Sequence, residues 1–109
     1  MDLSIAEKIY SQIISSSLTS MVDKLIRSGI RYARLRVDWY LLPTAERHER
    51  DNEQRIAHDA FISSCNILSR NMGEIGEDIS WRRILGSNRK NIGDIACVIQ
   101  MIIGLRALL

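Results

Sequence analysis

Apolar residues recur every three or four positions through residues 4–27, which is the spacing of one face of an α-helix. Ser4 and Glu7 stand three residues apart at its start, as the partners of a capping box do. The serine run 15–17 favours helix poorly, but the apolar phase continues across it. We therefore predict a first helix that begins near Ser4 and either ends at Gly29 or continues past it.

The segment 34–39 alternates polar and apolar residues, which is the pattern of a half-buried strand. Ile30, Ala33, Val37 and Leu41 nevertheless fit one helical face. No other segment alternates well enough to pair with a strand here, and an unpaired strand would leave its backbone groups unsatisfied. We therefore predict helix at residues 34–39.

A second long helix is predicted after Pro43, with Thr44 as its cap and its end near residues 72–73. Its first part, residues 46–54, contains only charged and amide side chains and histidine. From residue 56 onward, apolar residues form a broad face that we expect to be buried.

Two further helices complete the chain after a turn rich in glycine and acidic residues. Asp78 is predicted to cap a short helix that Gly86 ends, and Ser87 or Asn88 begins an apolar helix at the centre of the core. The predicted fold class is all-α. It is a small bundle of three to four helices, two long, one short and one apolar at the C-terminus, in a single domain of residues 1–109.

The predicted helix lengths leave two possibilities: either the first helix breaks at Gly29, or the molecule is an elongated helical hairpin. At about 1.5 Å per residue, the second helix would span ~42 Å and an unbroken first helix nearly ~60 Å. A compact globule of this size has a radius of gyration of only about 13 Å. An elongated helical hairpin would leave apolar surface at its ends, and a homodimer is the simplest way to cover it.

Composition indicates which partners and which cellular location to expect for the protein. A net charge of +2 is too small to imply a polyanionic partner. Cys65 and Cys97 belong to no CxxC pattern and have apolar neighbours, so we expect packed, reduced thiols and a cytoplasmic location. Asp2 argues against a signal peptide, and the apolar stretch 95–109 falls short of the ~20 residues of a membrane span. We predict no cofactor and no membrane partner.

Four polar residues of the second long helix are spaced by 4, 7 and 4 positions, which places them in one stripe opposite the apolar face. A histidine lies at its margin, and an arginine and an aspartate near the start of the last helix complete the set. The simpler interpretation is an exposed polar face with one ion pair, Arg55 with Asp59. The alternative is a partly buried polar network or an anion site. The candidate residues are Arg55, His58, Asp59, Asn66, Arg70, Arg89 and Asp94.

The dipeptide His58–Asp59 is compatible with a metal-dependent hydrolase, whose chemistry needs further ligands to hold a metal and activate water. The other histidine, His48, is predicted to lie on a different face of the same helix. No HExxH motif or Cys/His cluster occurs, Cys65 lacks a nearby base, and there is no glycine-rich phosphate loop. We therefore predict no catalytic, cofactor-binding or metal site.

Basic residues form two clusters of the kind that contact with a phosphate backbone requires. One becomes a stripe if the first helix continues past Gly29, and the other lies on the short helix. Because acidic residues are interleaved with them, a solvated or ion-paired surface is the simpler interpretation. The candidates for contact with nucleic acid are Lys24, Arg27, Arg31, Arg34, Arg82 and Arg83.

Two runs of the second long helix, RIAHDAFI at residues 55–62 and NILSR at 66–70, are followed by Arg89, Gly93 and Asp94 in the last helix. This pattern resembles a family of small uncharacterised helical proteins of Gram-positive bacteria and their phages. In that family an Arg precedes a His-Asp or His-Asn pair, an Asn/Leu/Arg triplet follows, and an Arg opens the final helix.

The resemblance covers roughly residues 51–106, and it implies an all-α fold but no particular function. Phage relatives favour a role in interactions without catalysis. Our leading hypothesis is therefore a non-enzymatic protein–protein interaction or oligomeric module, in which the polar segment 46–54 projects or lines a charged interface. The alternatives are an accessory protein of nucleic acids and, third, a hydrolase built on His58 and Asp59.

Overall fold

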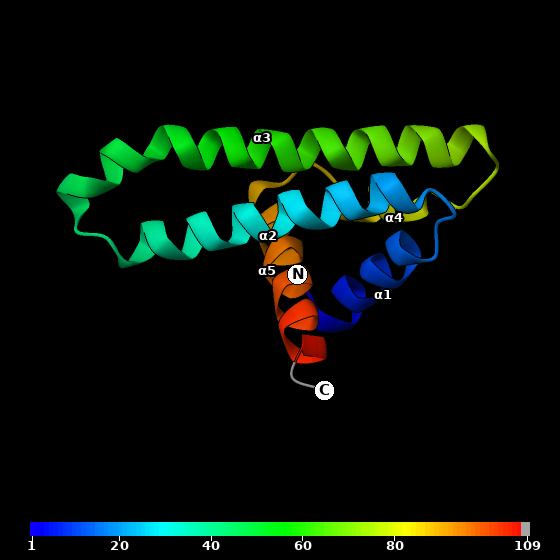
Figure 1. Cartoon of the computed structure of the whole chain (residues 1–109), viewed down its shortest axis with the longest axis horizontal. Helices are drawn as coiled ribbons and strands as arrows, with labels where there is room; N and C mark the ends of the chain where they lie inside the picture. The colour runs from blue at the N-terminus through cyan, green and yellow to red at the C-terminus, as the bar shows by residue number, and fades with distance from the viewer. Residues whose placement is uncertain (108–109) are drawn as a thin grey trace.

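The computed structural model describes residues 1–107, and the regular structure within them is all helical (Figure 1). In chain order the helices are α1 (Leu3–Ile14), α2 (Thr19–Leu41), α3 (Thr44–Glu74), α4 (Ser80–Leu85) and α5 (Arg89–Ala107). The predicted all-α class is confirmed, including the helix at residues 34–39. The predicted number of three to four helices is wrong, because five helices are present in the described residues.

The additional helix arises at the serine run, where α1 ends at Ile14 and α2 begins at Thr19. The Ser16 hydroxyl donates to Glu77 Oε1 over 2.6 Å, and the Ser17 backbone N–H donates to Glu77 Oε2 over 2.9 Å. A carboxylate from the turn after α3 thus replaces partners that a continuous helix would have supplied. The predicted continuous first helix is therefore wrong.

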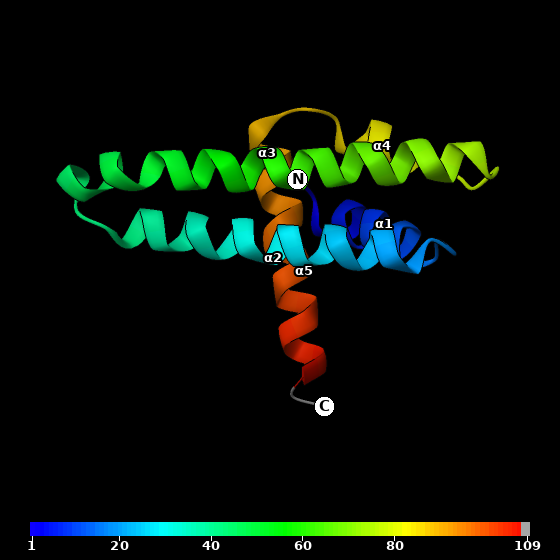
Figure 2. The ribbon, with the colours of Figure 1, turned by 45° about the horizontal axis from the view of Figure 1, so that its top comes forward.

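Gly29 lies inside α2 and does not end it. It is buried against α3, and a Cβ atom added to it would lie 3.0 Å from Cε1 of Phe61. The glycine is thus a point of close approach between α2 and α3, which run antiparallel and side by side (Figures 1 and 2).

Short polar side chains cap the starts of three helices. Asp2 Oδ1 accepts a hydrogen bond from the Ser4 backbone N–H over 2.7 Å, so α1 begins after Asp2 and the predicted cap at Ser4 is wrong. Asp78, the predicted cap of the short helix, lies one residue before Ile79, which directly precedes α4, and its Oδ1 accepts from the Ser80 N–H over 2.8 Å. Asn88 Oδ1 accepts from the first turn of α5 over 2.8 Å. These bonds satisfy N–H groups that a helix start leaves unpaired.

The antiparallel pair of α2 and α3 forms one layer, and α5 crosses it steeply and extends beyond it (Figure 2). Helices α1 and α4 pack on each other, and both contact α5. Side chains from all five helices fill the core, and those with no exposed surface include Ile9, Leu25, Phe61, Trp81 and Ile95.

The connected ends of α2 and α3 lie outside this core. Buried residues of α2 end at Ala33, and those of α3 begin at Ala57. We call residues 34–56 the hairpin tip. Because of this tip and the 31-residue α3, the molecule measures 48 × 31 × 25 Å with a radius of gyration of 14.2 Å, which agrees with the elongated alternative predicted from the helix lengths. Among the described residues, no helix has both the length and the hydropathy of a membrane span.

Candidate functional site

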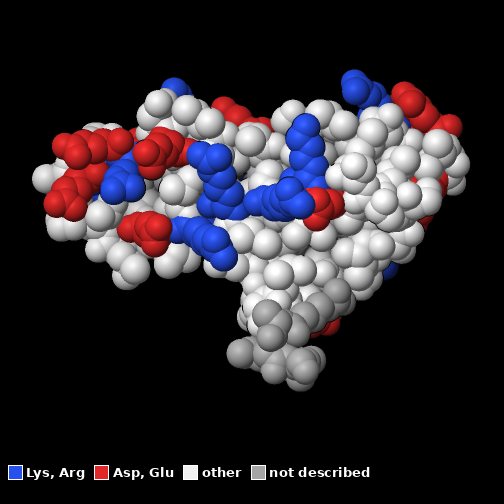
Figure 3. Space-filling model, in the orientation of Figure 1, with Lys and Arg blue, Asp and Glu red and all other residues white. Residues whose placement is uncertain are grey.

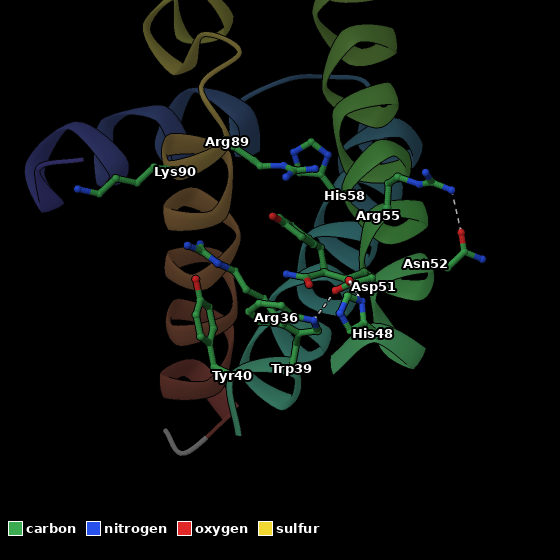
Figure 4. Close-up of a pocket in the computed structure, with 12 residues that line it drawn as sticks. Arg36, Trp39, Tyr40, His48, Asp51, Asn52, Arg55, His58, Arg89 and Lys90 are labelled. Atoms are coloured by element: carbon green, nitrogen blue, oxygen red, sulfur yellow. Dashed lines mark hydrogen bonds and ion pairs between the residues drawn. The ribbon is translucent and has the colours of Figure 1, made fainter. Parts of the chain in front are cut away.

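A cleft of about 880 Å³ lies between the second half of α2, the first half of α3 and the first turn of α5 (Figure 4). Four cations and one carboxylate line it: Arg36, Arg55, Arg89, Lys90 and Asp51. Its walls also carry five rings: Tyr32, Trp39, Tyr40, His48 and His58. The cleft is therefore aromatic and basic, with three positive charges in excess when the histidines are neutral.

Arg36 reaches the cleft because α5 presents a glycine where it crosses α2. Gly93 is buried, and a Cβ atom added to it would overlap the Arg36 guanidinium. Arg36 therefore lies directly on the backbone of α5, toward which it extends from α2 in Figure 4. Its Cζ lies 6.0 Å from the centre of the Tyr40 ring.

His58 stands on α3 deep in the cleft. Its side chain is 12% exposed, and its ring packs edge-on against Tyr32 with 5.2 Å between the ring centres. Nδ1 lies 3.2 Å from Oδ1 of Asp59, whereas Nε2 is enclosed and has no hydrogen-bond partner among the described residues. Arg89 points from α5 toward His58 (Figure 4). Both side chains line the same cleft.

The Tyr32 hydroxyl lies near cations of two helices, Arg36 of α2 and Arg89 of α5. Burial raises the pKa of Tyr32 above its ordinary value, and the positive charges of Arg36 and Arg89 oppose that rise. Both guanidiniums are therefore close enough to this hydroxyl to affect its ionisation. The hydroxyl stays protonated at neutral pH and is available as a hydrogen-bond donor. We call Tyr32, Arg36, His58 and Arg89 the inner site.

The hairpin tip forms the outer part of the cleft. Trp39 Nε1 donates to Asp51 Oδ1 over 2.6 Å and to the Arg47 carbonyl over 3.2 Å. The Arg47 guanidinium lies 4.8 Å from the centre of the Trp39 ring. Tyr40 meets Trp39 edge-on, with 5.1 Å between ring centres, and is 57% exposed. The carboxylate of Asp51 is therefore already engaged, and the Tyr40 ring is open to solvent.

Of the seven candidates for a polar network, Arg55, His58 and Arg89 line this cleft. Arg55 turns away from the inner site, and its Nη2 donates to Oδ1 of Asn52 over 2.9 Å in place of the predicted pair with Asp59 (Figure 4). Asp59 does not line the cleft, and its side chain is 70% exposed.

Asn66, Arg70 and Asp94 do not line this cleft. Asn66 Oδ1 accepts from Arg82 Nε over 2.9 Å, and Arg82 Nη1 also donates to the carbonyl that follows α4. This clamp borders a second, shallower hollow of about 450 Å³. Asp94 pairs with the amino group of Met1 over 2.9 Å, and Arg70 is exposed. The seven candidates therefore do not converge on one site.

The predicted basic stripe does form, because α2 continues through Gly29. Lys and Arg side chains gather over the middle of α2 in Figure 3, with acidic side chains toward the end where α2 leads into α3. One of them, Arg27, pairs with Asp23 over 3.0 Å. Arg82 is held in the clamp, whereas Arg83 is exposed. All four residues of the stripe are exposed: Lys24, Arg27, Arg31 and Arg34.

The sequence reasoning overlooked several residues of the cleft. Arg36 is the main omission, and the small residue Gly93 at the helix crossing was the signal that could have indicated it. His48 was predicted to lie on another face from His58, but both line the cleft because it runs lengthwise along α3. The sequence also contains the adjacent aromatic residues Trp39 and Tyr40, but it does not indicate that their rings line the cleft.

Comparisons with known proteins identify no relative of this chain. No family model, no curated protein and no solved structure matches the chain. Among the described residues, no group of three or more His, Cys, Asp or Glu side chains is arranged to hold a metal ion.

Proposed function

We propose that this chain is a non-enzymatic binding module whose basic cleft holds an anionic group. The excess of positive charge in the cleft is the observation that carries the proposal. Asp51 is the single carboxylate there, and it is engaged by Trp39 and lies 3.7 Å from His48. The charges of Arg36 and Arg89 are thus left for a ligand, because no carboxylate of the cleft pairs with them.

The chemistry of the lining residues supports binding more than catalysis. Arginines and a protonated tyrosine donate hydrogen bonds to oxygen atoms and fix an anion in place. Cys65 is fully buried in the core, and burial raises its pKa to about 12, so its thiolate is not available as a nucleophile. A hydrolase built on His58 and Asp59 stays a third hypothesis, and metal analysis of the purified protein tests it.

Thermal unfolding in the presence of simple anions tests the proposal. At constant ionic strength, an anion that binds the folded state and is present at ten times its Kd raises the free energy of unfolding by about 1.4 kcal/mol. We expect pyrophosphate and phosphate to stabilise the protein more than chloride does. The double variant Arg36→Gln/Arg89→Gln should lose this difference.

The matched control is Arg70→Gln/Arg83→Gln, which removes the same charge from exposed positions outside the cleft. It should keep the full response to pyrophosphate. Equal responses of the two double variants would refute the proposal, because the anion would then act as a general salt or bind elsewhere.

We propose, secondly, that the chain forms a homodimer, and one feature of the structure supports this. The end of α5 extends beyond α2 and α3, and Met101 and Leu105 there are 48% and 57% exposed (Figure 2). A second copy would cover such apolar surface. Sedimentation at micromolar concentration tests this, and a pure monomer would contradict it.

We also propose that the chain is related to small helical proteins of Gram-positive bacteria and phages and that its location is cytoplasmic. We further propose that the stripe of α2 can contact nucleic acid. The exposure of the stripe supports the last of these. Binding to DNA that is absent or insensitive to salt would remove it.

A further inference from the structure

The inner site gathers polar side chains from three helices around one space. Tyr32 and Arg36 come from α2, His58 from α3 and Arg89 from α5. The enclosed Nε2 of His58 has no partner among the described residues, although buried polar atoms are paired in most proteins. Arg36 and Arg89 line the same cleft and have no carboxylate partner in it, so their guanidinium donors are available to a ligand.

The charge of the cleft indicates which anion fits. The inner site holds two positive charges, those of Arg36 and Arg89, because Arg55 turns away from it. A carboxylate carries one negative charge and would leave one of these two charges unmatched. A phosphate monoester carries about −1.5 to −2 charges at neutral pH and has three strong acceptor oxygens. Guanidinium groups bind phosphate oxygens in pairs, and Arg36 and Arg89 approach from different helices. A terminal phosphate therefore matches the inner site better than a carboxylate.

The size of the cleft and its rings indicate what the phosphate carries. At about 880 Å³ the cleft has room for a small organic ligand, whose sites usually measure roughly 300–1,000 Å³. Tyr40 lines the outer part with an exposed ring that Trp39 supports from its edge. Flat exposed rings beside cations are the surfaces on which nucleic acid bases stack.

We propose that the cleft binds a phosphorylated nucleoside, with its phosphate at Arg36 and Arg89 and its base against Tyr40. This inference rests on the proposed function, because it names the ligand class of the same cleft. A free mononucleotide and the 5′-terminal nucleotide of a single strand present the same chemistry.

Calorimetric titration of the full chain with AMP, adenosine and inorganic phosphate tests the inference. AMP should bind about tenfold more tightly than phosphate or adenosine alone. Tyr40→Ala should weaken AMP binding about fivefold or more and leave phosphate binding unchanged. Arg36→Gln and Arg89→Gln should each weaken both ligands about tenfold, whereas the exposed control Arg70→Gln, which lies outside the cleft, should change neither.

Gly93→Ala provides a variant that keeps every charge. Its new methyl group occupies the position of the Arg36 guanidinium, so both AMP and phosphate should bind more weakly. Circular dichroism confirms that each variant is folded. Unchanged binding in Gly93→Ala would overturn the placement of the phosphate at Arg36.

The outcomes separate this inference from the proposed function. If AMP and phosphate bind equally and both need Arg36 and Arg89, the nucleoside is refuted but the anion-binding function stands. If none of the three ligands binds, both fail. If a 5′-phosphorylated decathymidylate binds more tightly than AMP, the ligand is the 5′ end of a single strand. If AMP binds more tightly, the ligand is a free nucleotide. Equal binding of the strand without its 5′-phosphate would overturn the inference.

Discussion

Three glycines inside helices allow the packing of α2, α3 and α5 to be tested with the smallest possible perturbation, a single added methyl group. A Cβ atom at Gly29 would lie 3.0 Å from a ring carbon of Phe61, which has no exposed surface. At Gly93 it would overlap the guanidinium of Arg36. At Gly104 no described atom lies within 4 Å.

The three neighbourhoods predict three different changes in stability. Alanine in place of a helical glycine gains about 1 kcal/mol from helix propensity alone. Gly104→Ala should show up to that gain. At Gly29 the Phe61 ring is fixed in the core, where overpacking costs about 1–3 kcal/mol, so Gly29→Ala should lose ~1 kcal/mol in net stability. In Gly93→Ala the guanidinium is the mobile end of a side chain and can move aside, so the net change should stay within about 1 kcal/mol.

Urea unfolding of the three variants, followed by circular dichroism, measures these differences as shifts of the midpoint at constant slope. Thermal unfolding provides a second measurement, since 1 kcal/mol corresponds to about 4–8 °C in a domain of this size. If Gly29→Ala gains as much stability as Gly104→Ala, the close approach of α2 and α3 at Phe61 is refuted. A loss above ~2 kcal/mol in Gly93→Ala would show that Arg36 cannot move, against our reasoning.

Other contacts lead to three further predictions. Asn66→Ala removes the acceptor for Arg82 Nε and should destabilise the protein by about 1 kcal/mol in urea unfolding, whereas no loss would show that the clamp is not formed in solution. The hydrogen bonds that Glu77 accepts from Ser16 and Ser17 lower the pKa of its carboxyl group below the usual 4.5. They therefore stabilise the fold above that pH, and this stability is lost as the pH falls through the lowered pKa. Glu77→Gln should accordingly lose less stability than the wild type between pH 6 and pH 3, and parallel pH curves would contradict the contact. Cys65 has no exposed surface and a pKa raised to about 12, while Cys97 is half-buried, so a disulfide reagent at pH 8 should label Cys97 first. Fast labelling of a Cys97→Ala variant would contradict this order.

The helices could be predicted largely from the sequence, because apolar spacing and helix breakers are local signals. The alternating segment 34–39 was correctly predicted as helix from the lack of any partner strand. The break at Ser16 and Ser17 could not be predicted in the same way. Its cause is Glu77, which is 61 positions from Ser16, and the local apolar phase continues across the serines.

The candidate site was harder to predict, because its residues come from three helices. Spacing along α3 selected Arg55 and His58, which both line the cleft, but it also selected Asn66 and Arg70, which do not. A stripe on one helix does not show where a second helix crosses it. Arg36 belongs to the site through that crossing alone.

The position of the hairpin tip has a consequence for its motion. Residues 34–56 contain no buried side chain, so their amide hydrogens should exchange with solvent well before those of the core. The cleft lies between this tip and the start of α5, whose Ile92 and Ile95 are fully buried. A ligand in the cleft would therefore connect the part of the fold that opens most readily to the part that opens least readily. Its binding would slow exchange across the whole tip, far beyond the residues that it contacts.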